Sequence, residues 1–205
     1  VVISSGNIFV NLTFSDNRAR NKDGGAINFH GETSKTSFSN VTFFKNAAGD
    51  SGGAINNDNN VNDENKYVNV DFINNTASKG GALNGYGQSN NNSFDGCSFA
   101  NNTAANDGGA IYYKGNMKSN IFESCSFVNN AAGNNGGVIF GFRDSISNKF
   151  NKDLFINNSA SNNASVIYYQ GSSTSDMFNS TEFRSNSADA MNGSAIAVLS
   201  TLVGR

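Results

Sequence analysis

The sequence predicts an all-β fold: a single-stranded, right-handed parallel β-helix, or solenoid, of about seven coils with roughly 28 residues each. Three observations support this prediction. A unit of similar residues recurs along the whole chain, apolar and polar residues alternate inside each unit, and glycine and asparagine gather where the chain must turn. We therefore expect residues 1–205 to form one repeat domain.

The repeating unit is anchored on a phenylalanine that returns every 27 to 29 residues. Its seven copies are Phe14, Phe43, Phe72, Phe99, Phe127, Phe155 and Phe183. An asparagine follows three residues after each of them, at Asn17, Asn46, Asn75, Asn102, Asn130, Asn158 and Asn186. A fixed period of this length without helical periodicity predicts one β-helical coil per unit.

The other shared positions of the unit indicate short strands joined by tight corners. Apolar and polar residues alternate from Val70 to Phe72 and from Cys97 to Phe99, which is typical of a strand with one face in the core. A Gly-Gly-Ala-Ile segment such as 108–111 closes each unit, although its two glycines become Ala164-Ser165 and Gly193-Ser194 in the last two units. We expect the polar segments 56–60 and 88–92 to be loops that project from one edge.

Stacked coils place equivalent residues about 4.8 Å apart, a spacing at which side-chain amides can hydrogen-bond in file. We therefore expect the asparagines from Asn17 to Asn186 to form an internal ladder, and the phenylalanines to form aromatic stacks. The chain contains no proline, as expected for paired strands, because proline cannot donate to a ladder.

Composition and charge restrict the possible functions. Hydrophobic residues make up only 37% of the chain, a level typical of disordered segments, but their regular columns allow a narrow, continuous core. The net charge is −2 and no basic stripe is present, so we expect no nucleic-acid partner. No run of about 18 apolar residues exists, so we expect no membrane insertion in this segment.

Cys97 and Cys125 occupy the same column in neighbouring units. Their Cα atoms should lie about 5 Å apart, within the range of a disulfide. The alternative, which we favour, is a pair of buried, stacked thiols, because parallel strands in register point both sulfurs the same way. Their spacing matches no zinc motif, and we predict no metal site and no cofactor.

A second aromatic column consists of Tyr112, Phe140 and Tyr168, which face outward by strand parity. Stacked exposed aromatics could bind sugar rings or side chains of a partner. The alternative is that loops cover these rings or that they stiffen that face. Tyr113 and Tyr169 have the opposite parity and are expected in the core.

No catalytic residues are predicted. Parallel β-helices also include polysaccharide lyases and glycosidases, which need a base or paired carboxylates. The only histidine is His30, and the densest acidic group, Asp58, Asp63 and Glu64, is interpreted as a solvated loop.

Asn-x-Ser/Thr motifs could carry N-linked glycans in an exported chain. The motifs considered begin at Asn11, Asn40, Asn74, Asn101, Asn157 and Asn179.

The Phe-x-x-Asn motif and the Gly-Gly-Ala-[Ile/Leu] motif at 24–27, 52–55, 80–83 and 108–111 cover nearly the whole chain. They resemble the repeats of chlamydial polymorphic outer-membrane proteins and, more broadly, those of adhesin-like surface proteins of methanogenic archaea. The strong asparagine bias resembles the archaeal group. The resemblance implies a secreted or surface-displayed β-helix, located outside the cell, that acts in attachment.

We therefore expect an adhesin-like rod that attaches to glycans, cells or partner proteins. Neither end of the sequence shows a recognisable capping repeat, and solenoid ends are normally protected. This favours a fragment of a longer protein or, as a second hypothesis, a subunit that forms an extracellular filament by coaxial, end-to-end stacking of copies. The third hypothesis is a polysaccharide lyase or glycosidase.

Overall fold

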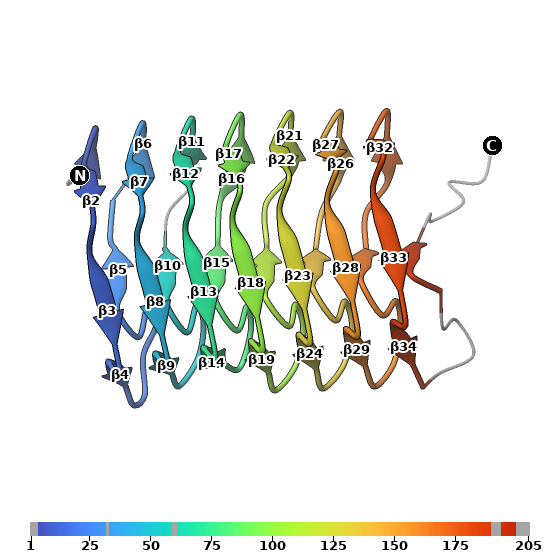
Figure 1. Cartoon of the computed structure of the whole chain (residues 1–205), viewed down its shortest axis with the longest axis horizontal. Helices are drawn as coiled ribbons and strands as arrows, with labels where there is room; N and C mark the ends of the chain where they lie inside the picture. The colour runs from blue at the N-terminus through green and yellow to red at the C-terminus, as the bar shows by residue number, and fades with distance from the viewer. Residues whose placement is uncertain (1–3, 32, 59–60, 190–193, 200–205) are drawn as a thin grey trace.

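The computed structural model shows an all-β parallel solenoid (Figure 1). The structure describes residues 4–31, 33–58, 61–189 and 194–199. Within them, five parallel sheets of seven strands each run along the rod, and every coil contributes one strand to each sheet. The predicted solenoid of about seven coils is therefore confirmed.

Three of the sheets consist of strands that follow one another closely along each coil. Sheet A contains β1 (Ser4–Ser5), β6 (Thr33–Ser34), β11 (Val61–Asp63), β16 (Gln88–Asn90), β21 (Met117–Lys118), β26 (Ser145–Ile146) and β31 (Ser173–Thr174). Sheet B contains β2 (Ile8–Val10), β7 (Ser37–Ser39), β12 (Lys66–Val68), β17 (Ser93–Asp95), β22 (Ile121–Glu123), β27 (Lys149–Asn151) and β32 (Met177–Asn179). Sheet C contains β3 (Thr13–Ser15), β8 (Thr42–Phe44), β13 (Asp71–Ile73), β18 (Ser98–Ala100), β23 (Ser126–Val128), β28 (Leu154–Ile156) and β33 (Glu182–Arg184).

The remaining two sheets flank the glycine-rich segment of the repeat. Sheet D contains β4 (Arg18–Ala19), β9 (Ala47–Ala48), β14 (Thr76–Ala77), β19 (Thr103–Ala104), β24 (Ala131–Ala132), β29 (Ser159–Ala160) and β34 (Ser187–Ala188). Sheet E contains β5 (Ile27–Phe29), β10 (Ile55–Asn57), β15 (Leu83–Gly85), β20 (Ile111–Tyr113), β25 (Ile139–Gly141), β30 (Ile167–Tyr169) and β35 (Ile196–Val198).

A residue in the left-handed conformation turns the chain between sheets A and B, B and C, and C and D. In one coil these residues are Asn91, Gly96 and Asn101, with φ of 54°, 59° and 56°. Asparagine and glycine adopt positive φ at least cost. The next residue belongs to the interior of each corner, so that the stacked coils create three corner columns.

The corner columns are named here in chain order. The first corner column is Asn7, Thr36, Asn65, Asn92, Asn120, Asn148 and Asp176. The second corner column is Leu12, Val41, Val70, Cys97, Cys125, Asp153 and Thr181. The third corner column is the predicted ladder, Asn17, Asn46, Asn75, Asn102, Asn130, Asn158 and Asn186.

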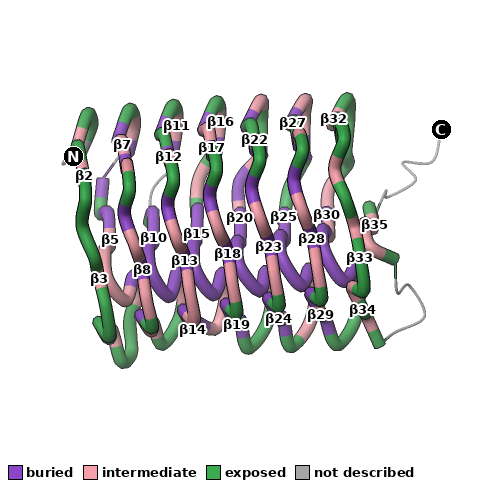
Figure 2. Tube along the Cα trace, viewed as in Figure 1, coloured by how far each residue is buried: buried purple, intermediate pink, exposed green. Residues whose placement is uncertain are grey.

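The core contains two files of stacked aromatic rings. In sheet C the repeat phenylalanines pair in register, and the rings of Phe72 and Phe99 have centroids 4.7 Å apart. In sheet B the rings of Tyr67 and Phe94 lie 4.5 Å apart. The tube in Figure 2 is purple where the inner coils carry these buried residues. The predicted stacks form a continuous apolar core. Burying each ring contributes roughly 1.5–3 kcal/mol to the stability of the fold.

The paired glycines of the repeat are required by close backbone packing. Gly108 has φ of 67°, and a Cβ there would lie 2.2 Å from the carbonyl oxygen of Ile111. A Cβ on Gly109 would lie 2.1 Å from the carbonyl oxygen of Gly137 in the next coil. Where alanine replaces the first glycine, Ala164 retains a φ of 52°, a conformation that is strained for a residue with a side chain.

The prediction of projecting loops at 56–60 and 88–92 was wrong for residues 56, 57 and 88–90. Asn56 and Asn57 belong to β10, and residues 88–90 form β16. The side chains of Asn56 and Asn90 donate to Asn28 and Asp63 of the preceding coil, so polarity did not mark a loop there. Residues 59 and 60, like residues 1–3 and 200–205 of the predicted domain, lie outside the described residues.

Candidate functional site

The third corner column forms the predicted asparagine ladder. The Nδ2 of Asn102 donates to Oδ1 of Asn130 at 3.0 Å and to the carbonyl oxygen of Phe72 at 2.8 Å. The backbone N–H of Asn102 donates to the same Oδ1 at 3.0 Å. This pattern repeats along the column, whose five inner members are fully buried. Each buried carboxamide thus has hydrogen-bond partners for its own donor and acceptor, and it also supplies a partner to a backbone group of a neighbouring coil.

The first corner column is a second ladder, which the sequence reasoning missed. Asn92 donates through its N–H and Nδ2 to Oδ1 of Asn120 at 3.0 and 3.1 Å. Asn120 does the same to Asn148, and Asn148 to a carboxylate oxygen of Asp176. The usable signal was an asparagine two residues before the first aromatic of the unit, which Thr36 and Asp176 interrupt.

The second corner column contains the two cysteines, both free and buried. The next member, Asp153, is 1% exposed and accepts the N–H of Cys125 at 2.7 Å through Oδ1, while its Oδ2 has no hydrogen-bond partner. Burial raises the pKa of the Asp153 carboxyl to about 7, with Glu123 adding to the effect and the Cys125 N–H opposing it. Hydrogen bonding to Cys97 and burial raise the pKa of the Cys125 thiol.

The outward column of sheet E changes from asparagine to aromatic residues halfway along the rod. It begins with Asn28, Asn56 and Asn84, and continues with Tyr112, Phe140 and Tyr168. The ring centroids of Tyr112 and Phe140 lie 5.0 Å apart and those of Phe140 and Tyr168 5.6 Å apart. Tyr112 and Phe140 are only 6% and 3% exposed, and Tyr168 is half-buried.

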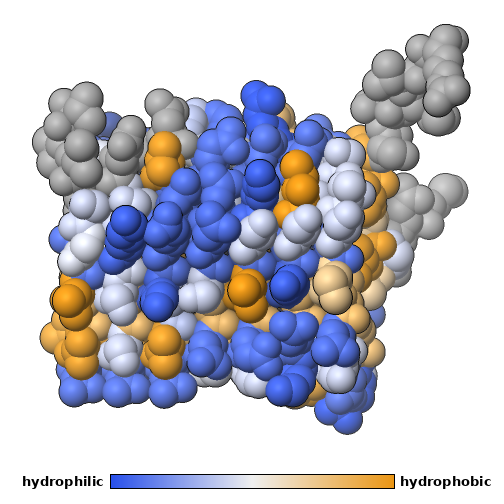
Figure 3. Space-filling model, turned by 90° about the horizontal axis from the view of Figure 1, so that it is seen from above, coloured by the Kyte–Doolittle hydropathy of each residue, from blue (hydrophilic) through white to orange (hydrophobic). Residues whose placement is uncertain are grey.

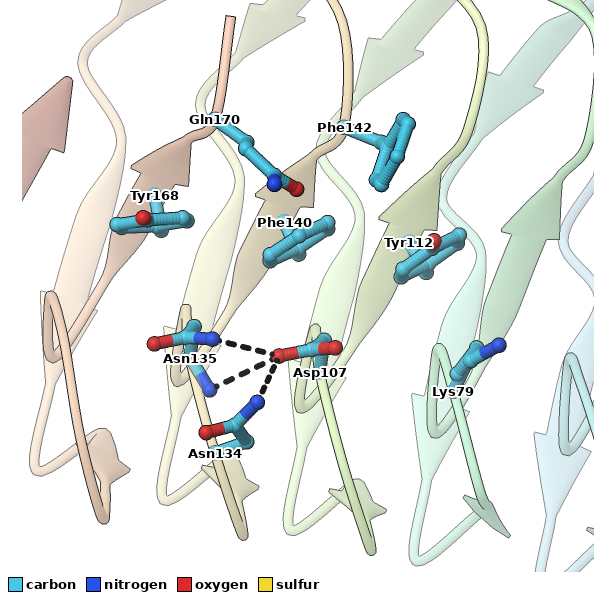
Figure 4. A pocket seen from close by; sticks show the side chains of 9 residues that line it. All are labelled: Lys79, Asp107, Tyr112, Asn134, Asn135, Phe140, Phe142, Tyr168 and Gln170. Carbon is cyan, nitrogen blue, oxygen red and sulfur yellow. Dashed lines mark hydrogen bonds between the residues drawn. The ribbon is translucent and has the colours of Figure 1, made fainter. Parts of the chain in front are cut away.

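These three rings form the floor of a hollow of about 330 Å³, called here the aromatic groove. Figure 4 shows them in a row along the rod, with two walls beside them. One wall consists of Phe142 and Gln170, and the other of Lys79, Asp107, Asn134 and Asn135. The surrounding side chains therefore cover much of the predicted aromatic platform, while Phe142 is 40% exposed at its rim. Tyr113 and Tyr169 lie in the core as predicted.

Hydrogen bonds fix the polar wall of the aromatic groove. Oδ1 of Asp107 accepts from Nδ2 of Asn134 at 3.0 Å, and from the backbone N–H and Nδ2 of Asn135 at 3.2 and 2.9 Å. Nζ of Lys79 lies 5.8 Å from the centroid of the Tyr112 ring. Burial, followed by the Asp107 carboxylate, raises the pKa of Tyr112 to about 12 and also raises that of Tyr168. Both phenols are therefore neutral hydrogen-bonding groups at neutral pH.

The predicted glycosylation asparagines lie mostly at corners. Asn11, Asn40, Asn74, Asn101 and Asn157 are left-handed corner residues with φ of 54°, 52°, 57°, 56° and 54°. Asn179 is the exposed last residue of β32. All but the half-buried Asn74 are exposed. Glycan attachment stays a prediction.

Charged side chains are dispersed over the described residues. His30 is exposed and lies 3.4 Å from Asp58, measured from Nδ1 to Oδ2, whereas Asp63 accepts a hydrogen bond from Asn90. No group of three or more His, Cys, Asp or Glu side chains that could hold a metal ion occurs in this part of the chain.

Figure 3 shows a face on which hydrophobic side chains are scattered among hydrophilic ones. Over the residues that the structure describes, no helix has the length and apolar character needed to cross a membrane.

Fold and columns together define a parallel β-solenoid built from a short, regularly repeated unit. Four stretches match the family model of the Chlamydia polymorphic membrane protein repeat: residues 11–29, 40–58, 69–86 and 96–114. Each includes the Phe-x-x-Asn and Gly-Gly-Ala-[Ile/Leu] motifs of one coil, and together they cover less than half of the chain. No curated protein and no solved structure matches the chain significantly.

The chain thus carries Chlamydia polymorphic membrane protein repeats, which confirms the resemblance inferred from its motifs. These repeats suggest a cell-surface, adhesin-like β-helix. The match does not distinguish the archaeal group that the asparagine bias resembles, so that assignment stays a prediction.

Proposed function

We propose that this chain is a rigid, surface-displayed rod that attaches its cell to a glycan, another cell or a partner protein through a lateral face. The observation that carries the proposal is the match to surface-protein repeats within a fold whose sides are regular and whose interior is continuous. Stacked aromatic files and asparagine ladders make the rod stiff, so that a side face keeps its shape over several coils.

The lateral face that best suits contact includes the aromatic groove. A concave site with apolar residues and a few fixed polar groups is typical of a binding site. Asp107 is held by three hydrogen bonds, and Phe142 is exposed on the opposite wall. A preorganised wall of this kind reduces the entropy lost on binding.

The proposal is tested by display and by adhesion. Antibodies against the folded chain should label intact cells of the source organism, and beads coated with the chain should bind target cells more than beads coated with albumin. Soluble chain should compete with the beads. Labelling only after permeabilisation, or bead binding equal to the albumin control, would contradict the proposed role.

A further inference from the structure

The aromatic groove runs parallel to the rod axis, because its parts repeat from coil to coil. Its floor takes one ring from each of β20, β25 and β30, at Tyr112, Phe140 and Tyr168. Its volume of about 330 Å³ falls within the range of small-molecule sites. A ligand in the groove would therefore lie along the rod and cross three coils.

Several polar atoms of the groove are available to a ligand. Among the described residues, the hydroxyls of Tyr112 and Tyr168 and Oδ2 of Asp107 have no hydrogen-bond partner. The Gln170 side chain on the opposite wall is exposed. These groups can both donate and accept, as a ligand rich in hydroxyls requires.

The charges and the apolar surface point to a neutral sugar. The lining contains one cation, Lys79, and one anion, Asp107, so the groove does not select a strongly charged ligand. Phe142 offers an exposed aromatic surface across the groove from Lys79 and Asp107. A pyranose presents apolar C–H faces and a rim of hydroxyls, which matches this combination.

The spacing of the groove argues for an extended glycan rather than a peptide. Coils repeat about every 4.8 Å, whereas an extended peptide advances about 3.3 Å per residue and so loses register with the coils. Pyranoses joined by equatorial 1,4 linkages advance close to one coil per sugar. We propose that the aromatic groove binds a linear, uncharged β-1,4-linked glycan parallel to the rod, with one sugar on each of three coils. This inference deepens the proposed attachment function and rests on it.

Calorimetry with glucose oligomers provides the test. The probes are β-1,4-linked glucose oligomers of two to six units, the corresponding N-acetylglucosamine oligomers, and α-1,4-linked glucose tetramer as the control. At least one β-linked series should bind, its affinity should rise to three or four sugars and then level off, and the α-linked tetramer should bind more weakly. Ligand addition should shift the ring NMR signals of Tyr112, Phe140 and Tyr168.

Matched variants locate the site. Phe142→Ala and Asp107→Asn should each lower the association constant roughly tenfold, the order expected for losing one aromatic or charge-assisted contact. Tyr86→Ala removes another exposed aromatic, 48% exposed and outside the groove lining, and should bind like the parent. Melting curves of all three should show that they remain folded.

Three outcomes would overturn the inference: no binding by either β-linked series, affinity independent of length, or equal losses in Tyr86→Ala and Phe142→Ala. Binding of an extended peptide in place of the sugars would also overturn it. If the sugars fail while coated beads still adhere to cells, attachment stands and uses another surface. If the sugars bind while the beads do not adhere, the groove stands and the attachment role falls.

Discussion

The second and third corner columns occupy equivalent positions, yet one is chemically mixed and the other is asparagine in every coil. Both follow a left-handed residue and both are buried in the inner coils. The third column accepts and donates hydrogen bonds at each step, whereas Val41 and Val70 in the second column have no side-chain acceptor to offer. The difference shows that the corner backbone itself tolerates apolar residues. Asparagine is needed only where the neighbouring coils also carry amides, because each amide there depends on the next for a hydrogen bond.

The largest effect should come from placing valine in the third corner column. Asn102→Val removes the acceptor for two donors of Asn75 and the donor to the Phe72 carbonyl oxygen. Each unpaired buried group costs about 1–3 kcal/mol, so we expect a loss of at least roughly 3 kcal/mol of unfolding free energy. Chemical denaturation checks this value. A midpoint equal to that of the parent would show that the ladder contributes nothing to stability.

The next effect concerns Asp153, the one carboxylate in the second corner column. Its folded pKa is raised from 3.8 to about 7, so between these values the folded state holds a proton that the unfolded state has released. Stability from this group is therefore complete below about pH 4 and decreases as the pH rises to about 7. Asp153→Asn removes the penalty of the buried charge and should be more stable than the parent at pH 8, by roughly 2–4 kcal/mol.

Denaturation of both proteins at several pH values measures the Asp153 effect. Near pH 4 the carboxyl is neutral in the folded state, so the two proteins should differ little. Other carboxyls titrate in both proteins and cancel in the comparison. Parallel stability curves between pH 4 and pH 8 would exclude a buried, proton-binding Asp153.

The smallest effect should come from placing valine in the second corner column. Cys97→Val repeats the residue that Val70 already supplies one coil earlier. It loses only weak sulfur hydrogen bonds, those from Cys97 Sγ to the carbonyl oxygens of Tyr67 at 3.4 Å and Asp95 at 3.6 Å and the one shared with Cys125. We expect a change within about 1 kcal/mol, measured under the conditions used for Asn102→Val. A loss as large as that of Asn102→Val would remove the contrast between the two columns.

Exact recurrence made much of this fold predictable. The phenylalanine files and the third corner column follow directly from residues that repeat in every unit, because coils in register place like side chains together. The first corner column was missed because Thr36 and Asp176 interrupt it and its polar surroundings resemble a loop. Its signal, an asparagine two residues before the first aromatic of most units, is therefore weaker than that of the third corner column.

The outward aromatic column shows a different limit. Strand parity correctly gives the direction of Tyr112, Phe140 and Tyr168, but not what covers them. The low exposure of Tyr112 and Phe140 depends on walls formed by turn residues such as Asp107 and by residues just after a strand, such as Phe142. The positions of turns depend on backbone geometry and hydrogen bonds between coils, which no single repeat encodes.

The asparagine ladder also has a direction. Every link donates from one coil to the oxygen of the next coil along the chain, from Asn17 through Asn46 to Asn186. Aligned amide dipoles polarise one another, so each link strengthens its neighbours. The ladder therefore has an electric dipole along the rod axis. Any further coil could extend the ladder only if its asparagine had the same orientation.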